Sequence, residues 1–340
     1  MGVRAGWGGR VLSLWFGVLA AVLLLSAILW GASQRVAAWG GAISRWDQVL
    51  LRTPSSPQAA KPVAFSSSPS TQPTGSNLPS GMVLGYYYDP GDPQGSLQFL
   101  QHYEGVLSGI IPFWYTVNAD GQIAGGTQTR VLTWAMAHHL WVFGLVRSQG
   151  GPQVLDQLLQ NNTAEERAIA EMLTLVESNR FDGINLDWEG IDPRERDAFS
   201  QFVQRLSRTF HQHGYLVTLS LPAEVSNNPN DSWTGAYDYQ ALGRAADLVM
   251  IMAYDQHWAG GPPGPIASPS WVRQVLSYTI SAIPPQKVIL GIPGYGYDWS
   301  SNGAVALSYP QAVALQKQYD PTAIPLPSSG APVPPPLPPR

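Results

Sequence analysis

Two carboxylates stand two residues apart in segment 181–190, which has the sequence FDGINLDWEG. Side chains on a β-strand alternate between its two faces, so the polar side chains of this segment share one face and the apolar ones share the other. The polar set is Asn185, Asp187 and Glu189, and the apolar set is Ile184, Leu186 and Trp188. The pattern therefore predicts a strand with two acids on one face.

Asp187 and Glu189 have a spacing that suits acid–base chemistry. At a rise of about 3.3 Å per residue their Cα atoms lie about 6–7 Å apart, close enough for each charge to affect the other. Neither acid can ionise freely beside a charged neighbour, so such a pair is costly to keep without a function. A solvent-facing edge strand or a buried, ion-paired strand is the alternative interpretation.

Strands and helices are expected to alternate from residue 81 onward. Strands are expected at 81–88, 109–115, 141–146, 182–189, 215–221, 247–254 and 287–293. Helices are expected at 97–103, 129–138, from a capping box at Thr163 and Glu166, after an N-cap at Asp192, and at 239–245, 271–283 and 309–319. Several strands are continuous apolar runs, which is typical of parallel strands buried on both faces.

The alternation predicts an α/β protein with a TIM (β/α)8-type barrel. An open, doubly wound sheet is the competing fold. The barrel is favoured because the polar residues follow the carboxyl ends of the strands, where barrels of this type keep their active sites. No Gly-rich phosphate loop follows the first strand, which also argues against the open sheet.

The composition argues against several classes of function. A net charge of −4 without basic patches argues against nucleic acid as a partner. With no cysteine, the chain has no disulfide, no thiol nucleophile and no zinc–thiolate site. His257 is too isolated for a metal site, and no cofactor is expected. The 13 Trp and 14 Tyr residues suit a groove that stacks sugar rings, although such side chains are as often part of a core.

Residues 11–30 form an uncharged, largely apolar run that is long enough to span a membrane. We interpret this run as an uncleaved anchor, and a cleaved signal peptide is the alternative. The chain then divides into an anchor or signal segment, a Ser/Pro-rich linker, a barrel and a Pro-rich tail. These parts are residues 1–33, 34–80, 81–320 and 321–340. The barrel is therefore expected to be extracytoplasmic, tethered to the membrane or, after cleavage, secreted.

Three motifs resemble the signatures of glycoside hydrolase family 18, the chitinase-like barrels. They are Asp182-Gly183-x-x-x-Asp187-x-Glu189, Met252-Ala253-Tyr254-Asp255 and Gly291-Ile292-Pro293-x-Tyr295-Gly296. Further runs at 113–121, 236–239 and 255–258 are most similar to the branch of the family that acts in bacterial spore-cortex lysis and germination. The resemblance covers about residues 81–320.

This resemblance implies a TIM barrel and retaining hydrolysis of a β-1,4 bond next to N-acetylglucosamine, in peptidoglycan or a chitin-like polysaccharide. In this family the acetamido oxygen of the substrate is the nucleophile. The resemblance implies that Glu189 is the general acid, that Asp187 orients the acetamido group and that Tyr254 hydrogen-bonds to its oxygen. Asp255 is implied to contact the sugar or the acid. Alternatively, Tyr254 fills the barrel and Asp255 forms a loop turn.

Five further residues are candidates for substrate binding. Asn185 and Met252 belong to the motifs, and Asn185 stands where many family members carry Asp. An amide can still donate a hydrogen bond to Asp187 but cannot share its proton. Tyr295, Trp114 and Tyr88 are candidate sugar-stacking walls, with core packing as the alternative for each.

No segment after residue 299 has the pattern of an eighth strand. Residues 309–319 are expected to be helical, and the Pro-rich residues 321–340 cannot form a central strand. The resemblance implies an inserted segment and a closing strand here, and neither is found. We therefore expect a barrel that lacks its closing strand, with unpaired edges on the first and seventh strands, and interpret the chain as a truncated or partial gene product.

Two alternatives to a substrate-assisted glycosidase remain open. The first is a catalytically silent carbohydrate-binding or envelope protein, which the missing strand favours. The second is a conventional two-carboxylate glycosidase for sugars that lack the acetamido group. The expected location is the bacterial cell surface or the spore envelope.

Overall fold

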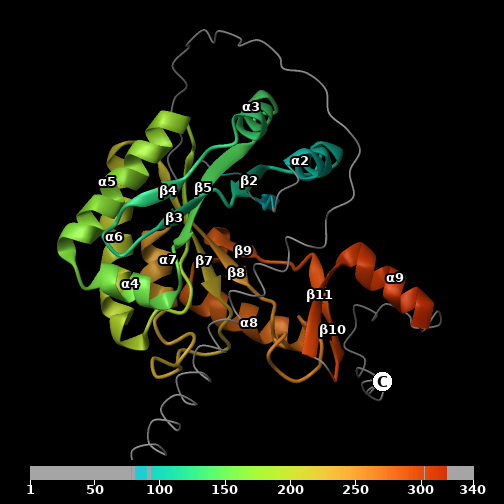
Figure 1. Ribbon diagram of the computed structural model, residues 1–340. Coiled ribbons are helices and arrows are strands. Elements are labelled where there is room, and N and C mark those ends of the chain that lie inside the picture. The colour runs from blue at the N-terminus through green and yellow to red at the C-terminus, as the bar shows by residue number, and fades with distance from the viewer. Residues whose placement is uncertain (1–77, 79–80, 90–92, 302, 320–340) are drawn as a thin grey trace, which may run out of the picture. The chain divides into compact units, whose positions relative to one another are not determined.

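The computed structural model describes residue 78 and residues 81–89, 93–301 and 303–319 (Figure 1). The predicted membrane segment at 11–30, nearly all of the predicted linker and the Pro-rich tail lie outside these residues. Of the helices that the structure describes, none combines the length and the apolar character needed to span a bilayer.

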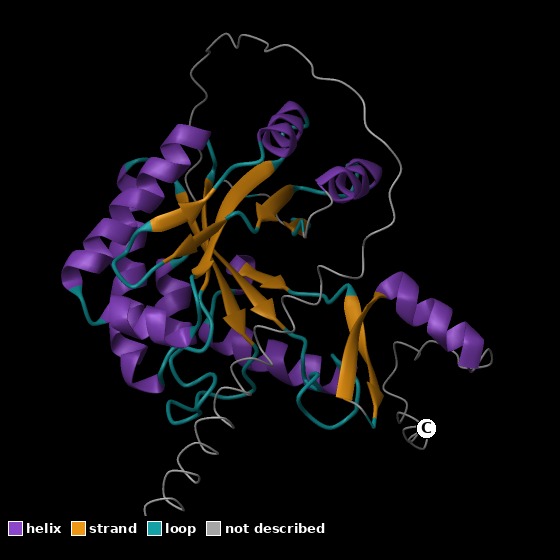
Figure 2. Cartoon of the chain, in the orientation of Figure 1, coloured by secondary structure: helices purple, strands orange, loops and turns teal. Residues whose placement is uncertain are grey.

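A mainly parallel sheet organises the described chain (Figure 2). Its strand order is β1 (Leu84–Tyr87), β2 (Gly109–Pro112), β5 (Trp141–Ser148), β6 (Gly183–Asp187), β7 (Leu216–Pro222), β8 (Leu248–Met252) and β9 (Val288–Leu290). Every neighbouring pair along this path is parallel. The predicted alternation of strands and helices, with consecutive strands side by side, is confirmed.

The predicted strand at 109–115 forms two strands in the structure. β2 ends at Pro112, which has no N–H to donate to a ladder. The chain turns there, because the Trp114 N–H donates to the Pro112 carbonyl at 2.9 Å. It continues as β3 (Tyr115–Val117), which is antiparallel to β4 (Ile123–Gly125) and parallel to the end of β5.

Helices follow the strands, and all but the last of the described helices lie on the outer side of the sheet (Figure 2), whereas the last packs beside the hairpin formed by residues 295–308. They are α2 (Pro93–His102), α3 (Thr129–Ala137), α4 (Pro152–Leu159), α5 (Asn162–Asn179), α6 (Arg196–Gln212), α7 (Tyr239–Ala245), α8 (Pro269–Ala282) and α9 (Tyr309–Tyr319), with 3-10 turns at Pro193–Glu195 and Pro285–Lys287. The start of α5 differs from the predicted capping box. Asn161 is its N-cap, and the Asn161 side chain accepts from the N–H groups of Thr163 and Ala164 at 3.1 and 3.3 Å.

The sheet separates two apolar clusters. The outer cluster lies between strands and helices and includes Trp188, which stacks on Phe199 and Phe202 of α6 with ring centroids 6.0 and 4.8 Å apart. The inner cluster is made by the opposite faces of the strands. Its buried members are Met82, Ile111, Phe143, Leu145, Leu216, Leu248 and Met250. Both faces of the strands are therefore buried, as their apolar sequences predict.

The sheet is curled, because strands far apart in its order meet face to face. The Tyr86 hydroxyl on β1 lies 2.6 Å from Ser220 Oγ on β7. Three strands separate β1 from β7 in the sheet, and a flat sheet would hold them about 19 Å apart at its usual strand spacing. The described chain therefore has a TIM-barrel-like fold, with the inner faces of the strands turned toward one another.

The curled sheet is not joined end to end within the part of the chain that the structure describes. β1 and β9 are the two ends of its strand order, and no pairing joins them. After β9 the chain forms a separate two-stranded hairpin of β10 (Tyr295–Ser300) and β11 (Gly303–Ser308), followed by α9. Neither this hairpin nor α4 was anticipated from the sequence patterns.

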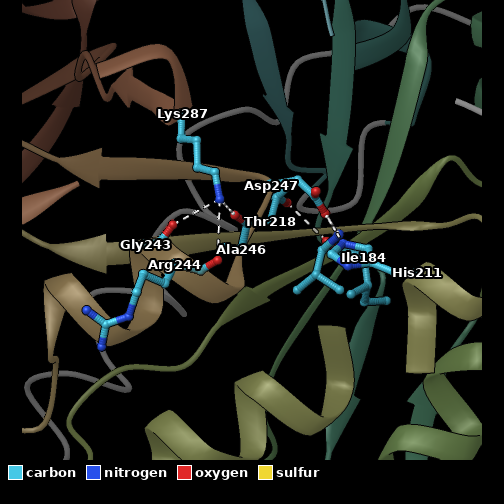
Figure 3. Close-up of polar contacts among 9 residues, drawn as sticks. Ile184, His211, Thr218, Gly243, Arg244, Ala246, Asp247 and Lys287 are labelled. Carbon is cyan, nitrogen blue, oxygen red and sulfur yellow. Dashed lines mark hydrogen bonds and ion pairs between the residues drawn. The ribbon is translucent and has the colours of Figure 1, made fainter. Parts of the chain in front are cut away.

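Aspartates that precede two of the strands accept from the N–H of the second residue of the neighbouring strand. Asp182, before β6, accepts from the Val142 N–H at 2.7 Å. Asp247, before β8, accepts from the Val217 N–H at 2.8 Å and from His211 Nε2 at 2.9 Å (Figure 3). These contacts satisfy backbone N–H groups at the amino-terminal ends of the strands and help to fix the register of adjacent strands.

Lys287, at the end of the 3-10 turn before β9, binds the carboxyl end of α7. Its Nζ donates to the carbonyls of Gly243, Arg244 and Ala246 at 3.1, 3.4 and 2.7 Å (Figure 3). The last carbonyls of a helix have no partner within the helix and carry the negative end of its dipole. A single ammonium therefore caps α7 and ties it to the start of β9.

Replacing Lys287 with Met is expected to lower the free energy of unfolding by about 1.5–3 kcal/mol, because charge-assisted hydrogen bonds to backbone carbonyls are lost. Chemical denaturation of the full chain measures the change. Lys317→Met, on the exposed end of α9, is the control and should change stability by less than about 0.5 kcal/mol. Equal effects of the two substitutions would contradict the capping role of Lys287.

Candidate active site

The predicted pair of acids, Asp187 and Glu189, lies at the carboxyl end of β6. Asp187 is the last residue of β6 and is 8% exposed, whereas Glu189 is partly exposed. Trp188, between them, is buried in the outer cluster. The predicted division of this segment into a polar face and an apolar face is confirmed, and the structure turns the apolar face toward the helices.

Asn185 forms part of a polar floor beneath the acids. Its side-chain amide donates to Thr218 Oγ1 at 3.0 Å, and its side-chain oxygen accepts from Ser220 Oγ at 3.0 Å. Tyr86 of β1 completes the chain through its contact with Ser220. Asn185 is fully buried, so the structure places it beneath the site, where its hydrogen bonds hold β6 to β7.

Asp187 is a buried acid with a cation on the neighbouring strand. Arg147 of β5 is its partner in the sheet register. Burial raises the pKa of Asp187, and the positive charge of Arg147 opposes that shift. Asp187 Oδ1 is buried and has no hydrogen-bond partner among the described residues. An unpaired buried acceptor costs about 1–3 kcal/mol, and such atoms often mark a place where a ligand binds.

Glu189 has a pKa well above its ordinary value. Burial is the largest cause, followed by the negative charges of Asp187 and Asp255. Like charges in a poorly solvated space cannot all ionise together, so one of these carboxyl groups keeps its proton to a higher pH. Of the three carboxyl groups, Glu189 is the one expected to keep its proton, because the charges of both Asp187 and Asp255 raise its pKa.

Tyr254 faces the same group of acids from the end of β8. Burial raises its pKa far above the ordinary value, and the charges of Asp187, Glu189 and Asp255 add to the shift. Its hydroxyl therefore remains a hydrogen-bond donor at any physiological pH. The Tyr254 ring packs edge-on against Tyr295, with centroids 6.0 Å apart. The structure thus brings together Asp187, Glu189, Tyr254 and Tyr295.

Asp255 follows Tyr254 and has left-handed backbone geometry, with φ 58°. It is exposed, and its Oδ1 accepts from the Tyr297 hydroxyl at 3.1 Å. Met252 is the last residue of β8, is partly buried and is paired with Pro222 of β7. Both motif residues therefore lie at the carboxyl end of β8, as predicted.

Two of the candidate aromatic walls differ in their surroundings. Tyr88 lies just after β1, partly buried, with its ring edge-on to Phe113 at 5.7 Å. Phe113 packs against the inner cluster, so Tyr88 is on the inner side of the sheet. Trp114 instead belongs to the outer cluster, where it is 9% exposed and 6.2 Å from Phe181. For Trp114 the alternative of core packing describes the structure, and the site does not include it.

Three residues of the site region were missed by the sequence patterns. Tyr86 reaches Ser220 from β1, and its pKa is raised by burial and then by the charge of Asp187. Arg147 stands one residue beyond the predicted end of its strand. Tyr297 belongs to the unpredicted hairpin. Of these three residues only Tyr86 could have been predicted from the sequence, because side-chain alternation along 84–88 places it on the same face of the strand as Tyr88.

The arrangement can donate a proton and hydrogen-bond a polar group, but it has no set of metal ligands. No three His, Asp or Glu side chains among the described residues gather as a metal site. His257 is occupied locally, with Nδ1 3.0 Å from the Pro262 carbonyl. The chemistry available is thus that of a protonated acid, a second acid and a tyrosine hydroxyl.

Fold and site together define a TIM-barrel-like protein with an acid–base site at the carboxyl end of a central strand. The sequence matches the profile described as "Glycosyl hydrolases family 18" over residues 144–323, which is more than half of the chain. The chain therefore belongs to glycosyl hydrolase family 18, and the resemblance inferred from its motifs is confirmed.

Relatives in the family include bacterial proteins connected with spores. The "Uncharacterized glycosylase YvbX" of Bacillus subtilis is 32% identical over 65% of this chain and 65% of that protein. The "Cortical fragment-lytic enzyme" of Bacillus anthracis is 33% identical over 48% of this chain and 39% of that protein. The chain thus spans less than two thirds of the length of these relatives.

Solved structures share the fold. A chitinase from Chromobacterium violaceum is 29% identical, with a TM-score of 0.66 over 70% of this chain and 76% of that one. The Bacillus cereus spore cortex-lytic enzyme SleL is 26% identical, with a TM-score of 0.64 over 69% of this chain and 57% of that one. Both similarities extend over most of the described residues of this chain.

A further buried acid, Glu224, lies apart from this site. It is 5% exposed, and burial raises its pKa to about 8. Its charged neighbours are Arg196, Asp231 and Asp238, and neither carboxyl oxygen has a hydrogen-bond partner of normal geometry among the described residues. The Tyr278 hydroxyl also interacts with this carboxyl group and opposes the rise of its pKa. A raised pKa is therefore not confined to the candidate active site.

Glu224→Gln is expected to stabilise the protein at high pH. The folded state holds this proton up to about pH 8, whereas the unfolded chain releases it near the ordinary value of 4.5, so Glu224 lowers stability as pH rises across that window. At pH 8 the variant should exceed the parent by about 1–3 kcal/mol, and the two should converge near pH 4.5. Denaturation at several pH values measures this, with exposed Glu166→Gln as the control. A pH-independent difference would contradict the assignment.

Proposed function

We propose that the protein is a retaining glycoside hydrolase that cleaves β-1,4 bonds next to N-acetylglucosamine by substrate-assisted catalysis. The observation that carries this proposal is the carboxyl group of Glu189, which is held beside Asp187 at the end of β6 with a raised pKa. Protonation of a glycosidic oxygen requires an acid that keeps its proton near neutral pH.

In the proposed reaction Glu189 gives its proton to the leaving glycosidic oxygen as the bond from that oxygen to the anomeric carbon breaks. The acetamido oxygen of the same sugar forms the new bond to the anomeric carbon, which yields a cyclic oxazolinium ion. Asp187 stabilises the positive charge, and Tyr254 donates a hydrogen bond to the acetamido oxygen. Water then attacks the anomeric carbon as the bond from that carbon to the acetamido oxygen breaks, and the water gives a proton to Glu189, which restores the acid.

The unpaired oxygen of Asp187 supports this assignment. Asp187 Oδ1 is buried without a partner among the described residues, and an acetamido N–H or a charged intermediate would satisfy it. A conventional two-carboxylate mechanism would instead use the second acid as a nucleophile, with about 5–5.5 Å between the carboxyl groups. Inhibition by an oxazoline-like compound would favour the substrate-assisted route.

The proposed substrate is peptidoglycan or a chitin-like polymer. Relatives named for cortical fragments and neighbours named as chitinases support this class. We also propose that the barrel acts outside the cytoplasm, on a membrane anchor formed by residues 11–30, because that uncharged run is long enough to span a bilayer.

A silent glycan-binding protein is the second candidate. The observation that favours it is the unjoined sheet, because β1 and β9 are not paired within the described residues. Such a protein would bind N-acetylglucosamine oligomers without releasing products, and the binding would not depend on the proton of Glu189.

Glu189→Gln is expected to reduce the hydrolysis of N-acetylglucosamine oligomers by about 10²- to 10⁴-fold, because the amide cannot donate the catalytic proton. The rate of hydrolysis is measured by chromatography of the products that the full chain releases. Glu166→Gln, an exposed change of the same type on α5, should hydrolyse at the parent rate. If Glu189→Gln retained full turnover, Glu189 would not be the acid.

Asp187→Asn is expected to change the pH profile as well as the rate. Activity requires protonated Glu189, so it falls as pH rises through the pKa of Glu189. Asp187 contributes to the elevation of that pKa, so removing its charge should move the basic limb of kcat/KM to lower pH. The residual activity of the variant, measured across pH, tests this. A basic limb that stayed in place would show that Asp187 does not act on Glu189.

A further inference from the structure

The hairpin that follows β9 carries a row of aromatic side chains. Within the described chain β10 and β11 pair only with each other. Alternation along β10 places Tyr295, Tyr297 and Trp299 on one face. Neighbouring rings in this row lie 5.7 and 5.5 Å apart, and all three residues are partly buried. The hairpin is therefore a stiff element, although it lies outside the main sheet (Figure 1).

This aromatic row meets the end of β8 at two consecutive residues. The Tyr295 ring packs against Tyr254, and the Tyr297 hydroxyl donates to Asp255 Oδ1 at 3.1 Å. The hydroxyl of Tyr295 also stabilises the Asp255 carboxylate. The hydroxyl groups of two tyrosines of β10 thus interact with the Asp255 carboxylate, which lies 42 residues earlier in the chain than Tyr297.

Asp255 has a backbone conformation that needs external support. Its φ of 58° is in the left-handed region, which costs a residue other than glycine about 1–2 kcal/mol, although Asp tolerates it better than most. An exposed side chain at such a position would otherwise be free to rotate. The hydrogen bond from Tyr297, together with the contact from Tyr295, holds the carboxylate in one orientation.

We propose that Tyr297 is a positioning residue, which holds the Asp255 carboxylate in the group of acids around Glu189. This inference rests on the proposed function, since it concerns the acid that would protonate the substrate. Tyr297 itself does not contact the reacting atoms. Its effect passes through Asp255 and is an electrostatic effect on Glu189.

The direction of that effect follows from the charges. The titratable groups that act on Glu189 or Asp255 are Tyr86 of β1, Asp187 of β6, Tyr237 before α7, Tyr254 after β8, and Tyr295 and Tyr297 of β10. Without the Tyr297 hydroxyl the pKa of Asp255 rises, because that hydrogen bond favours its charged form. If the side chain rotates away instead, its charge moves away from Glu189. Rotation of the carboxylate reduces the negative charge near Glu189, and a higher proton affinity of Asp255 makes it compete with Glu189 for the proton, so the pKa of Glu189 falls in both cases.

Tyr297→Phe tests the proposal, because it removes one hydroxyl and keeps the ring. In the full chain acting on N-acetylglucosamine oligomers, the basic limb of kcat/KM should move to lower pH by roughly 0.5 unit or more. In the Asp255→Asn background the same substitution should produce no further shift. Tyr309→Phe, at an exposed tyrosine at the start of α9, is the matched control and should reproduce the parent profile.

A profile that only loses height, with its basic limb in place, would overturn the proposal and leave Tyr297 a purely structural residue. A second readout separates this failure from that of the proposed function. The carboxyl carbon of ¹³C-labelled Glu189, assigned with Glu189→Gln, can be titrated by NMR without any turnover. If the parent were inactive on every polymer but Tyr297→Phe still lowered this titration midpoint, the proposed function would fail and the positioning role would stand. An unchanged midpoint would overturn the positioning role.

Discussion

The site depends on repulsion between carboxyl groups that the fold gathers at the carboxyl ends of its strands. Asp187 and Glu189 lie at the end of β6 and Asp255 lies after β8, with β7 between the two strands, and burial together with repulsion from the other two acids raises the pKa of Glu189. In water each acid would be ionised at neutral pH, and none would have a proton to give. Trp188 maintains the geometry, because its ring is stacked in the helix layer, and a slip of one residue would exchange the two faces of β6.

The features that were predictable are those contained in a single segment. The alternation along 181–190 predicted that the acids and Trp188 lie on opposite faces, because a strand has a period of two whatever surrounds it. Motif residues at the end of β8 were predicted for the same reason. The order of strands followed from their alternation with helices, since consecutive parallel strands usually lie side by side.

Contacts between distant segments could not be predicted in this way. Tyr86 and Ser220 are 134 residues apart, and nothing local to either indicates that the sheet curls enough to join them. Trp114 was a candidate sugar wall by its type, yet the turn after Pro112 places it in the outer cluster. Glu224 shows that a raised pKa does not by itself mark a functional site, because burial is the main cause of the shift there and the acids of the candidate active site are not among its neighbours.

The polar floor also bears on the shape of the sheet. Tyr86 meets Ser220, Ser220 donates to Asn185, Asn185 to Thr218, and Thr218 to the carbonyl of Ile184 at 3.0 Å. Each group in this series accepts a hydrogen bond from the group before it and donates one to the next, and the series ends at a backbone carbonyl of β6. It crosses the interior of the curled sheet from β1 to β7 and β6. Because these hydrogen bonds connect β1 to β7 across the interior, the sheet keeps its curvature even though β1 and β9, its end strands, are not paired with each other within the described residues.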